Sequence, residues 1–136
     1  MHTQRWISSR IAANVHPQVA AVAIDWTKPL PPVINTGQWD LVVVADCVHW
    51  EWLFDPLIKT LMQLLPRTRA MLLSITHRFG RSATFLEKIR IATERRGYVF
   101  RCVTAAAGGR AVLVNNTDIY EVVLSNAPGA VFPSFK

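Results

Sequence analysis

The residues best suited to chemistry lie together, directly after an apolar stretch in the first half of the chain. The run from Leu41 to Ala45 ends at Asp46, and a cluster follows that contains His49, Trp50, Glu51 and Trp52. A β-branched run bounded by polar residues predicts a strand buried on both faces, as in a parallel sheet covered by helices. Because ligands collect at the carboxyl ends of such strands, this stretch is the predicted functional site.

Each of these residues also has a structural interpretation. Asp46 could cap or turn the chain after the strand, and His49 could be a hydrogen-bonding residue rather than a base, because a proton can also leave to water. Tryptophans pack in cores or at their rims more often than they form ligand cages. The pattern alone leaves both interpretations open.

Size and composition predict one domain with its own core. The chain has 136 residues, of which 51% are hydrophobic, enough for a real core. We expect a single domain over residues 1–125 and a tail over residues 126–136. Cys47 and Cys102 form no CxxC or Cys/His spacing, so reduced thiols are expected and a metal site is not. No run resembles a signal-peptide core or a membrane span, which favours a cytoplasmic or nuclear protein.

The charge is basic, with 15 Lys and Arg against 9 Asp and Glu. Such an excess favours acidic or polyanionic partners such as RNA or an acidic protein. A solvated basic face is the simpler interpretation, so nucleic acid is not the expected partner. The arginines concerned are Arg78, Arg81, Arg95, Arg96 and Arg101.

Helices and strands alternate along the predicted first half. A short helix begins near Thr3 and stops at His16-Pro17. A strand is predicted from Gln18 to Trp26, and the Pro-rich segment from Thr27 to Gln38 is a predicted loop.

The helix after the central strand has clear sequence signals at both ends. Asp55 is a candidate N-cap, Pro56 occupies the first helical position, and Pro66 ends the helix. The segment from Arg69 to Thr76 follows as a second strand buried on both faces.

The last third predicts a helix and two strands. Thr84 and Glu87 form a capping box that opens a helix ending at Gly97. Strands are predicted for Tyr98 to Thr104 and for Ile119 to Leu124. No helix long enough for a crossover separates them, so they are expected to be antiparallel. The whole order describes an α/β fold.

This order, together with three local stretches, resembles the class I S-adenosylmethionine-dependent methyltransferases, in particular the small protein-lysine methyltransferases. Ile24-Asp25-Trp26 is similar to the family's acidic-Trp pair. The stretch WDLVVVADCVHWEWLFDPLIKTL resembles its Asp-x-x-Tyr motif with the following Pro-Leu-x-x-Thr-Leu helix. The strand ending near His77-Arg78 and the closing Arg96-Gly97-Tyr98 resemble its next strand and helix. The resemblance spans roughly residues 5 to 125.

The resemblance implies a partial Rossmann-like sheet, mostly parallel with a C-terminal antiparallel strand. No glycine-rich loop precedes Asp25, and the acidic residue expected to hold the ribose is missing. We therefore expect a truncated domain that lacks the N-terminal strands and binds the cofactor weakly or not at all by itself. Unpaired strand edges then predict self-association.

The implied cofactor is S-adenosylmethionine, and the implied substrate is a lysine side chain of a protein. By resemblance, Asp25 and Trp26 would lie against the adenine, and Ala45 with Asp46 would border the methionine part of the cofactor.

The implied catalytic residues are Asp46 and His49. The Asp46 carboxylate would attract and orient the lysine ammonium. His49 replaces the tyrosine of the motif and would act as a hydrogen-bond acceptor when neutral. Trp50 and Glu51 would contact the substrate, and Trp52 would add a second wall for an alkylammonium through cation–π contact.

Overall fold

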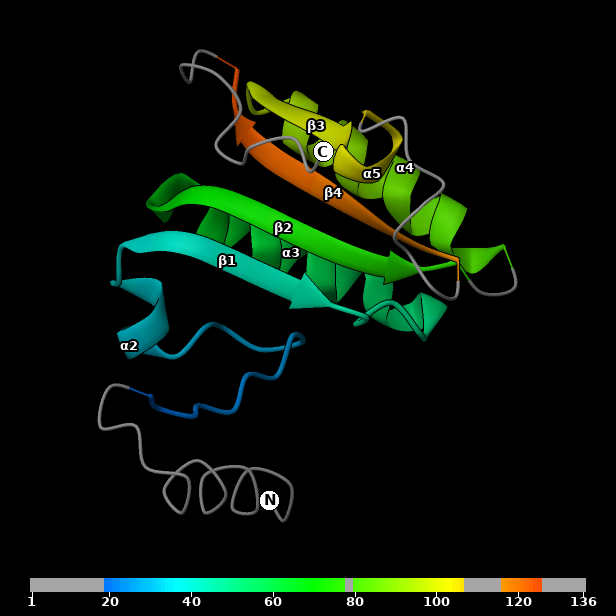
Figure 1. Cartoon of the computed structure of the whole chain (residues 1–136). Helices are drawn as coiled ribbons and strands as arrows, with labels where there is room; N and C mark the ends of the chain where they lie inside the picture. The colour runs from blue at the N-terminus through cyan, green and yellow to red at the C-terminus, as the bar shows by residue number, and fades with distance from the viewer. Residues whose placement is uncertain (1–18, 78–79, 107–115, 126–136) are drawn as a thin grey trace.

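The computed structural model describes residues 19–77, 80–106 and 116–125. These residues form a mixed α/β structure (Figure 1). Its elements in chain order are α2 (Pro32–Asn35), β1 (Trp39–Ala45), the 3₁₀ helix η1 (Glu51–Leu53), α3 (Phe54–Leu64), the 3₁₀ helix η2 (Leu65–Arg67), β2 (Thr68–Thr76), α4 (Arg81–Glu94), β3 (Tyr98–Cys102), α5 (Val103–Ala106) and β4 (Thr117–Leu124).

The four strands form one sheet in the order β1-β2-β4-β3. β1 and β2 are parallel, and β4 is antiparallel to both β2 and β3. Among the described strands, three therefore point the same way and β4 alone is reversed. This arrangement confirms the predicted partial methyltransferase sheet, including the antiparallel pairing of the final two strands.

Helices α3 and α4 cover the same face of the sheet (Figure 1). Met71, Leu73 and Ile75 on β2 point into this layer and are at most 1% exposed. Phe54 of α3 and Phe85 of α4 meet edge to face, with ring centroids 5.4 Å apart. The core therefore lies between the sheet and these two helices, where burial of apolar area stabilises both crossovers.

The start of α3 differs from the prediction. The helix begins at Phe54, because η1 leads directly into it, and no side chain caps it. Asp55 lies inside the first turn and its carboxylate accepts from Lys88 Nζ at 2.8 Å. The predicted end is confirmed, since α3 stops at Leu64 and Pro66 lies in η2.

The start of α4 also differs. The helix begins at Arg81, after Gly80 with φ 69°, three residues before the predicted capping box. Thr84 is therefore an interior residue, and Glu87 pairs with Arg90 at 2.7 Å instead of capping the helix. The predicted end is confirmed: Gly97 has φ 82° and its amide donates to the carbonyl of Glu94 at 3.0 Å.

The predicted strand from Gln18 to Trp26 is wrong for its described part, residues 19–26. No strand forms there, and Val19, Val22 and Ile24 are 52%, 41% and 37% exposed. A strand requires a neighbour for its backbone groups, and the described residues offer none to this segment. The predicted loop that follows contains the short helix α2. The predicted helix from Thr3 and the tail over 126–136 lie outside the described residues.

The prediction that the strand now labelled β1 is buried on both faces is wrong. Val44 points toward the helices and is 8% exposed, whereas Leu41 and Val43 on the opposite face are 40% and 60% exposed. The reason is position, since β1 is an edge strand and the described helices cover one face only. β3 ends two residues earlier than predicted, where α5 begins. Within the described ranges, no helix combines the length and apolarity that a membrane crossing needs.

Candidate functional site

All four strands bring polar residues to the same end of the sheet, which is called the carboxyl edge below because the parallel strands finish there. The parallel strands β1 and β2 end there, β4 starts there because it is reversed, and β3 ends there. The register pairs Ala45 with Ser74, Thr76 with Thr117, and Cys102 with Tyr120. This carboxyl edge is where open α/β sheets hold their ligands.

Asp46 is the first residue after β1. Its amide donates to the carbonyl of Ser74 at 2.9 Å, which fixes it to the end of the neighbouring strand. Its φ is 49°, a left-handed conformation that few residues other than glycine adopt. Such conformations are enriched at binding sites, because the surrounding structure must hold them in place. Asp46 therefore has an unusual backbone conformation at the strand end where the sequence predicts a site.

The cluster after Asp46 is exposed. His49 and Glu51 are accessible to solvent, and Trp50 and Trp52 are 59% and 71% exposed. In the described structure neither indole is a core residue, which leaves packing at the rim of the core as their structural interpretation. Two exposed indoles in one short segment leave apolar side-chain surface that a ligand can cover.

Cys47 shows that the same stretch is anchored. Cys47 and Val48 pack against the core, and the Cys47 thiol donates to the carbonyl of Ala45 at 3.4 Å. Burial raises the pKa of this thiol, which keeps it protonated and unreactive. The exposed residues 49–52 therefore directly follow two residues that are packed against the core.

Asp25 and Trp26 lie in a separate turn. The amide and hydroxyl of Thr27 donate to one oxygen of Asp25 at 2.9 and 2.6 Å, and Lys28 approaches the other at 3.6 Å. The hydrogen bond from the Thr27 hydroxyl is the main reason that the pKa of Asp25 is lowered. Trp26 packs against the core, and its carbonyl accepts from Thr60 in α3 at 3.5 Å. Both residues thus have structural roles here.

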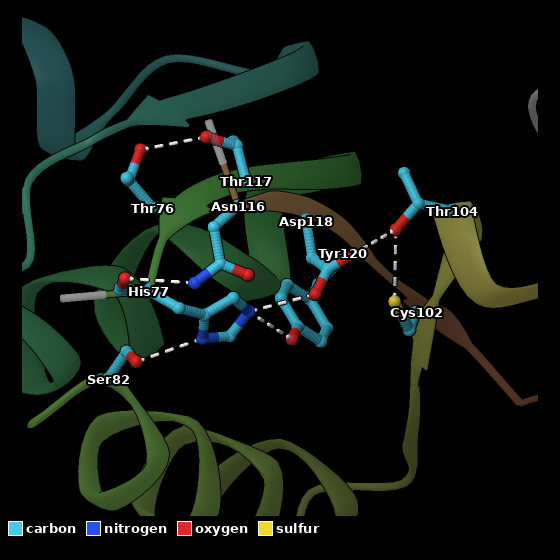
Figure 2. A network of polar contacts seen from close by, with 9 residues as sticks. All are labelled: Thr76, His77, Ser82, Cys102, Thr104, Asn116, Thr117, Asp118 and Tyr120. Carbon is cyan, nitrogen blue, oxygen red and sulfur yellow. Dashed lines mark hydrogen bonds and ion pairs between the residues drawn. The ribbon is translucent and has the colours of Figure 1, made fainter. Parts of the chain in front are cut away.

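A second polar cluster at the same edge was not predicted as a site. His77 follows β2, and its Nδ1 lies 2.9 Å from Ser82 Oγ while its Nε2 lies 2.8 Å from Asp118 Oδ2 (Figure 2). The hydroxyl of Tyr120 lies 3.4 Å from the same Nε2. Thr104 donates to the other oxygen of Asp118 at 2.7 Å. This His77 network joins the end of β2 to α4, β4 and α5.

Electrostatics favour a charged Asp118 in this network. The hydrogen bond from Thr104 is the main cause that lowers the pKa of the Asp118 carboxyl. The hydrogen bond from His77 and the charge of its imidazole lower this pKa further. Burial raises the pKa of Tyr120 to about 12, so its hydroxyl remains protonated. The network is therefore a fixed arrangement of donors around one carboxylate.

Ser82, His77 and Asp118 are also the residue types of a hydrolase triad. Ser82 is only 5% exposed. A nucleophile must reach its substrate, so this trio fastens the fold and does not attack a ligand. No sequence spacing signals it, because Asp118 lies 41 residues after His77.

Ion pairs reduce the basic surface that the composition suggested. Arg90 pairs with Glu87 and Glu94, both at 2.7 Å. Arg101, one of the arginines of the predicted basic face, pairs with Glu121, which is fully buried. Arg78 lies outside the described residues. Carboxylates of the protein itself therefore neutralise Arg90 and Arg101.

The described residues do not fit a complete S-adenosylmethionine pocket. The three described glycines have other uses: Gly80 and Gly97 flank α4, and the indole of Trp39 covers Gly37, where an added Cβ would lie 2.6 Å from Trp39 Cζ2. Two open cavities of about 380 and 290 Å³ lie away from Asp46, the first between α3 and α4 and the second at the opposite end of β1. In the described part of the chain, no group of three His, Cys, Asp or Glu is placed to hold a metal ion.

The sheet order and the reversed last described strand are consistent with a partial methyltransferase fold. A family model described as lysine methyltransferase matches residues 2–92, and the chain belongs to that family. The match confirms the resemblance read from the sequence. A search of curated proteins found no match to the chain.

Proposed function

We propose that this chain is of the protein-lysine N-methyltransferase type and that the stretch from Asp46 to Trp52 binds the acceptor lysine. The observations that carry the proposal are the left-handed backbone of Asp46 at the carboxyl end of β1 and the exposure of the two indoles that follow it in the chain. A carboxylate attracts and orients an ammonium, and indole faces attract an alkylammonium.

Each residue has a defined task in this proposal. Asp46 binds the ammonium, and Trp50 with Trp52 forms walls along the methylene chain. Glu51 adds negative charge beside the indoles, and His49 accepts a hydrogen bond from the substrate when its imidazole is neutral.

The proposal concerns acceptor binding. Family membership implies S-adenosylmethionine as the methyl donor, which would supply the methyl group for transfer to the amine. Because the described residues do not enclose this molecule, no transfer step is assigned to the chain alone.

Binding of a capped pentapeptide, Gly-Gly-Lys-Gly-Gly, tests the acceptor role. Indole N–H signals of the full chain are followed by NMR during titration, with a peptide carrying norleucine in place of lysine as the uncharged control. We expect the lysine peptide alone to shift the signals of Trp50 and Trp52. Asp46→Asn should weaken binding about tenfold, equivalent to about 1.4 kcal/mol.

Asp40→Asn is the matched control, since Asp40 is an exposed carboxylate near the opposite end of the same strand. It should bind the peptide as the wild-type chain does. Equal binding of both peptides, or equal loss in both variants, would contradict the acceptor role.

A calorimetric titration with S-adenosylmethionine completes the test. Micromolar affinity would show that the chain forms its own donor pocket. Salt-dependent binding of RNA or an acidic peptide, without lysine-peptide binding, would instead support a non-catalytic basic module.

A further inference from the structure

A cavity lies at the amino ends of β1 and β2, at the opposite end of these strands from the carboxyl edge. This amino-end cavity has a volume of about 290 Å³. Its lining includes Trp39 and Asp40 of β1, Arg67 of η2 and Arg69 of β2. The register pairs Trp39 with Thr68, so the lining comes from two strands that are bonded to each other.

Two of the lining side chains carry buried N–H groups that lack an acceptor. Trp39 Nε1 and Arg67 Nε are both buried, and neither has a hydrogen-bond partner in the part of the chain that the structure describes. Buried donors are normally paired, because leaving one without a partner costs free energy. Two unpaired donors on residues of one cavity therefore point to a ligand that supplies acceptors.

The charge of the arginines indicates that this ligand is an anion. Arg67 Nη2 donates to the side-chain oxygen of Asn35 at 2.7 Å and to the carbonyl of Gln63 at 3.5 Å. Both acceptors are neutral, so they fix the guanidinium without neutralising it. Arg69 is exposed, and neither arginine forms an ion pair with a described carboxylate. Guanidinium groups in this state bind oxyanions well.

Asp40 is the carboxylate in the lining of the cavity. It opposes an anion, but the two arginines leave an excess of one positive charge. Asp40 is also exposed, so solvent and salt screen its repulsion. The volume of the cavity is at the lower end of the range for ligand pockets, about 300–1,000 Å³. A small anion therefore suits this cavity.

We propose that the amino-end cavity binds a phosphate group. The donors are the N–H groups of Trp39 and Arg67 and the guanidinium of Arg69. A phosphate group suits them better than a carboxylate does, because a tetrahedral oxyanion offers a separate oxygen to each of the three residues. Since Trp39 Nε1 and Arg67 Nε are covered, binding requires rotation of these two side chains toward the cavity.

NMR of the Trp39 indole N–H during titration of the full chain with sodium phosphate tests the site. Sodium chloride at matched ionic strength is the control for screening. We expect a saturable shift with phosphate, with a dissociation constant on the order of 1 mM, and no such shift with chloride. O-phosphoserine is the second probe. Tighter binding than that of inorganic phosphate identifies a phosphomonoester as the ligand, and weaker binding identifies the free anion.

Variants of opposite charge effect sharpen the test. Arg69→Gln should weaken phosphate binding about fivefold, and Asp40→Asn should strengthen it about twofold, since solvent screens both exposed charges. Trp39→Phe keeps an aromatic ring but removes the N–H, so it should also weaken binding. Arg95→Gln is the matched control, because Arg95 is exposed at the end of α4 and does not line the cavity.

Calorimetry measures phosphate binding by the variants, and circular dichroism establishes that each variant folds. The same Trp39 shift in phosphate and chloride, or a shift that does not saturate, would overturn the proposal. Equal weakening by Arg69→Gln and Arg95→Gln, or weaker binding by Asp40→Asn, would do the same.

Discussion

The stretches that follow the two parallel strands end at the same sheet edge and differ in construction. After β2, the imidazole and backbone of His77 bond to Ser82, Asn116 and Asp118, with Tyr120 close by. After β1, residues 49–52 are mostly exposed, and their two indoles lie in contact with solvent. The residues after β2 are therefore hydrogen-bonded within the protein, whereas those after β1 are exposed to solvent.

This difference suggests that the stretch after β2 stabilises the fold and that the stretch after β1 is available for binding. The His77 network uses its donors and acceptors within the protein, so little remains for a ligand. The stretch after β1 leaves apolar surface in water, although burying a large apolar side chain is worth about 1.5–3 kcal/mol. A ligand that covers the indoles recovers this energy. The contrast supports the proposal that an acceptor binds on the β1 side.

The largest test of this contrast is the removal of Asp118. Asp118→Ala deletes the acceptor for Thr104 and for His77. At about 1 kcal/mol for each hydrogen bond, the free energy of unfolding should fall by about 2 kcal/mol. Urea denaturation of the full chain measures the change.

Trp52→Ala provides the comparison from the other stretch. This side chain is 71% exposed, so its removal should change the free energy of unfolding by less than about 0.5 kcal/mol. If Trp52→Ala costs as much as Asp118→Ala, residues 49–52 are part of the folded core, and the contrast fails.

A smaller effect is expected from pH. Because the pKa of Asp118 is lowered from its ordinary value of 3.8, its charged form stabilises the folded chain. This contribution is fully present above the ordinary pKa and is lost as the pH falls through the lower, folded value. The difference in unfolding free energy between the wild type and Asp118→Ala should therefore be larger at pH 5 than at pH 3.

The expected change is reduced because the Asp118 side chain is 39% exposed and solvent screens its interactions. Denaturation curves at the two pH values measure the difference. A gap that stays constant or widens toward pH 3 would contradict the network assigned to this carboxylate.

Sequence patterns predicted the parts of the fold that depend on local signals. The apolar runs of β1 and β2, the helix with Leu57 and Leu61 on its buried side, and the glycine that ends α4 all follow from periodicity and backbone preference. The signal for the position of Asp46 was equally local, since it directly follows an apolar run.

Features that depend on distant partners could not be predicted in this way. The segment from Val19 lacks a strand because no described neighbour pairs with it, although its composition favours one. The His77 network joins residues from four elements or their ends, and no spacing in the chain reveals it (Figure 2). Exposure of Val43 likewise follows from the position of β1 at the sheet edge, which residue type does not encode.

The smallest effect tests the backbone of Asp46. Asp46→Gly and Asp46→Ala both remove the carboxylate, so any contact made by that side chain is lost equally. They differ in the cost of φ 49°, which glycine adopts freely and alanine does not. After allowing for the greater freedom of glycine in the unfolded chain, Asp46→Gly should be more stable than Asp46→Ala by about 0.5–1 kcal/mol.

Ala45→Gly is the matched control, one residue earlier in the extended conformation of β1. There glycine should destabilise the chain by about 0.5–1 kcal/mol, so the sign of the effect reverses between adjacent positions. Both Asp46 variants should lose lysine-peptide binding to the same extent, whatever their stabilities. If binding follows stability and not the carboxylate, Asp46 acts through the fold, and the two stretches of the carboxyl edge have the same role.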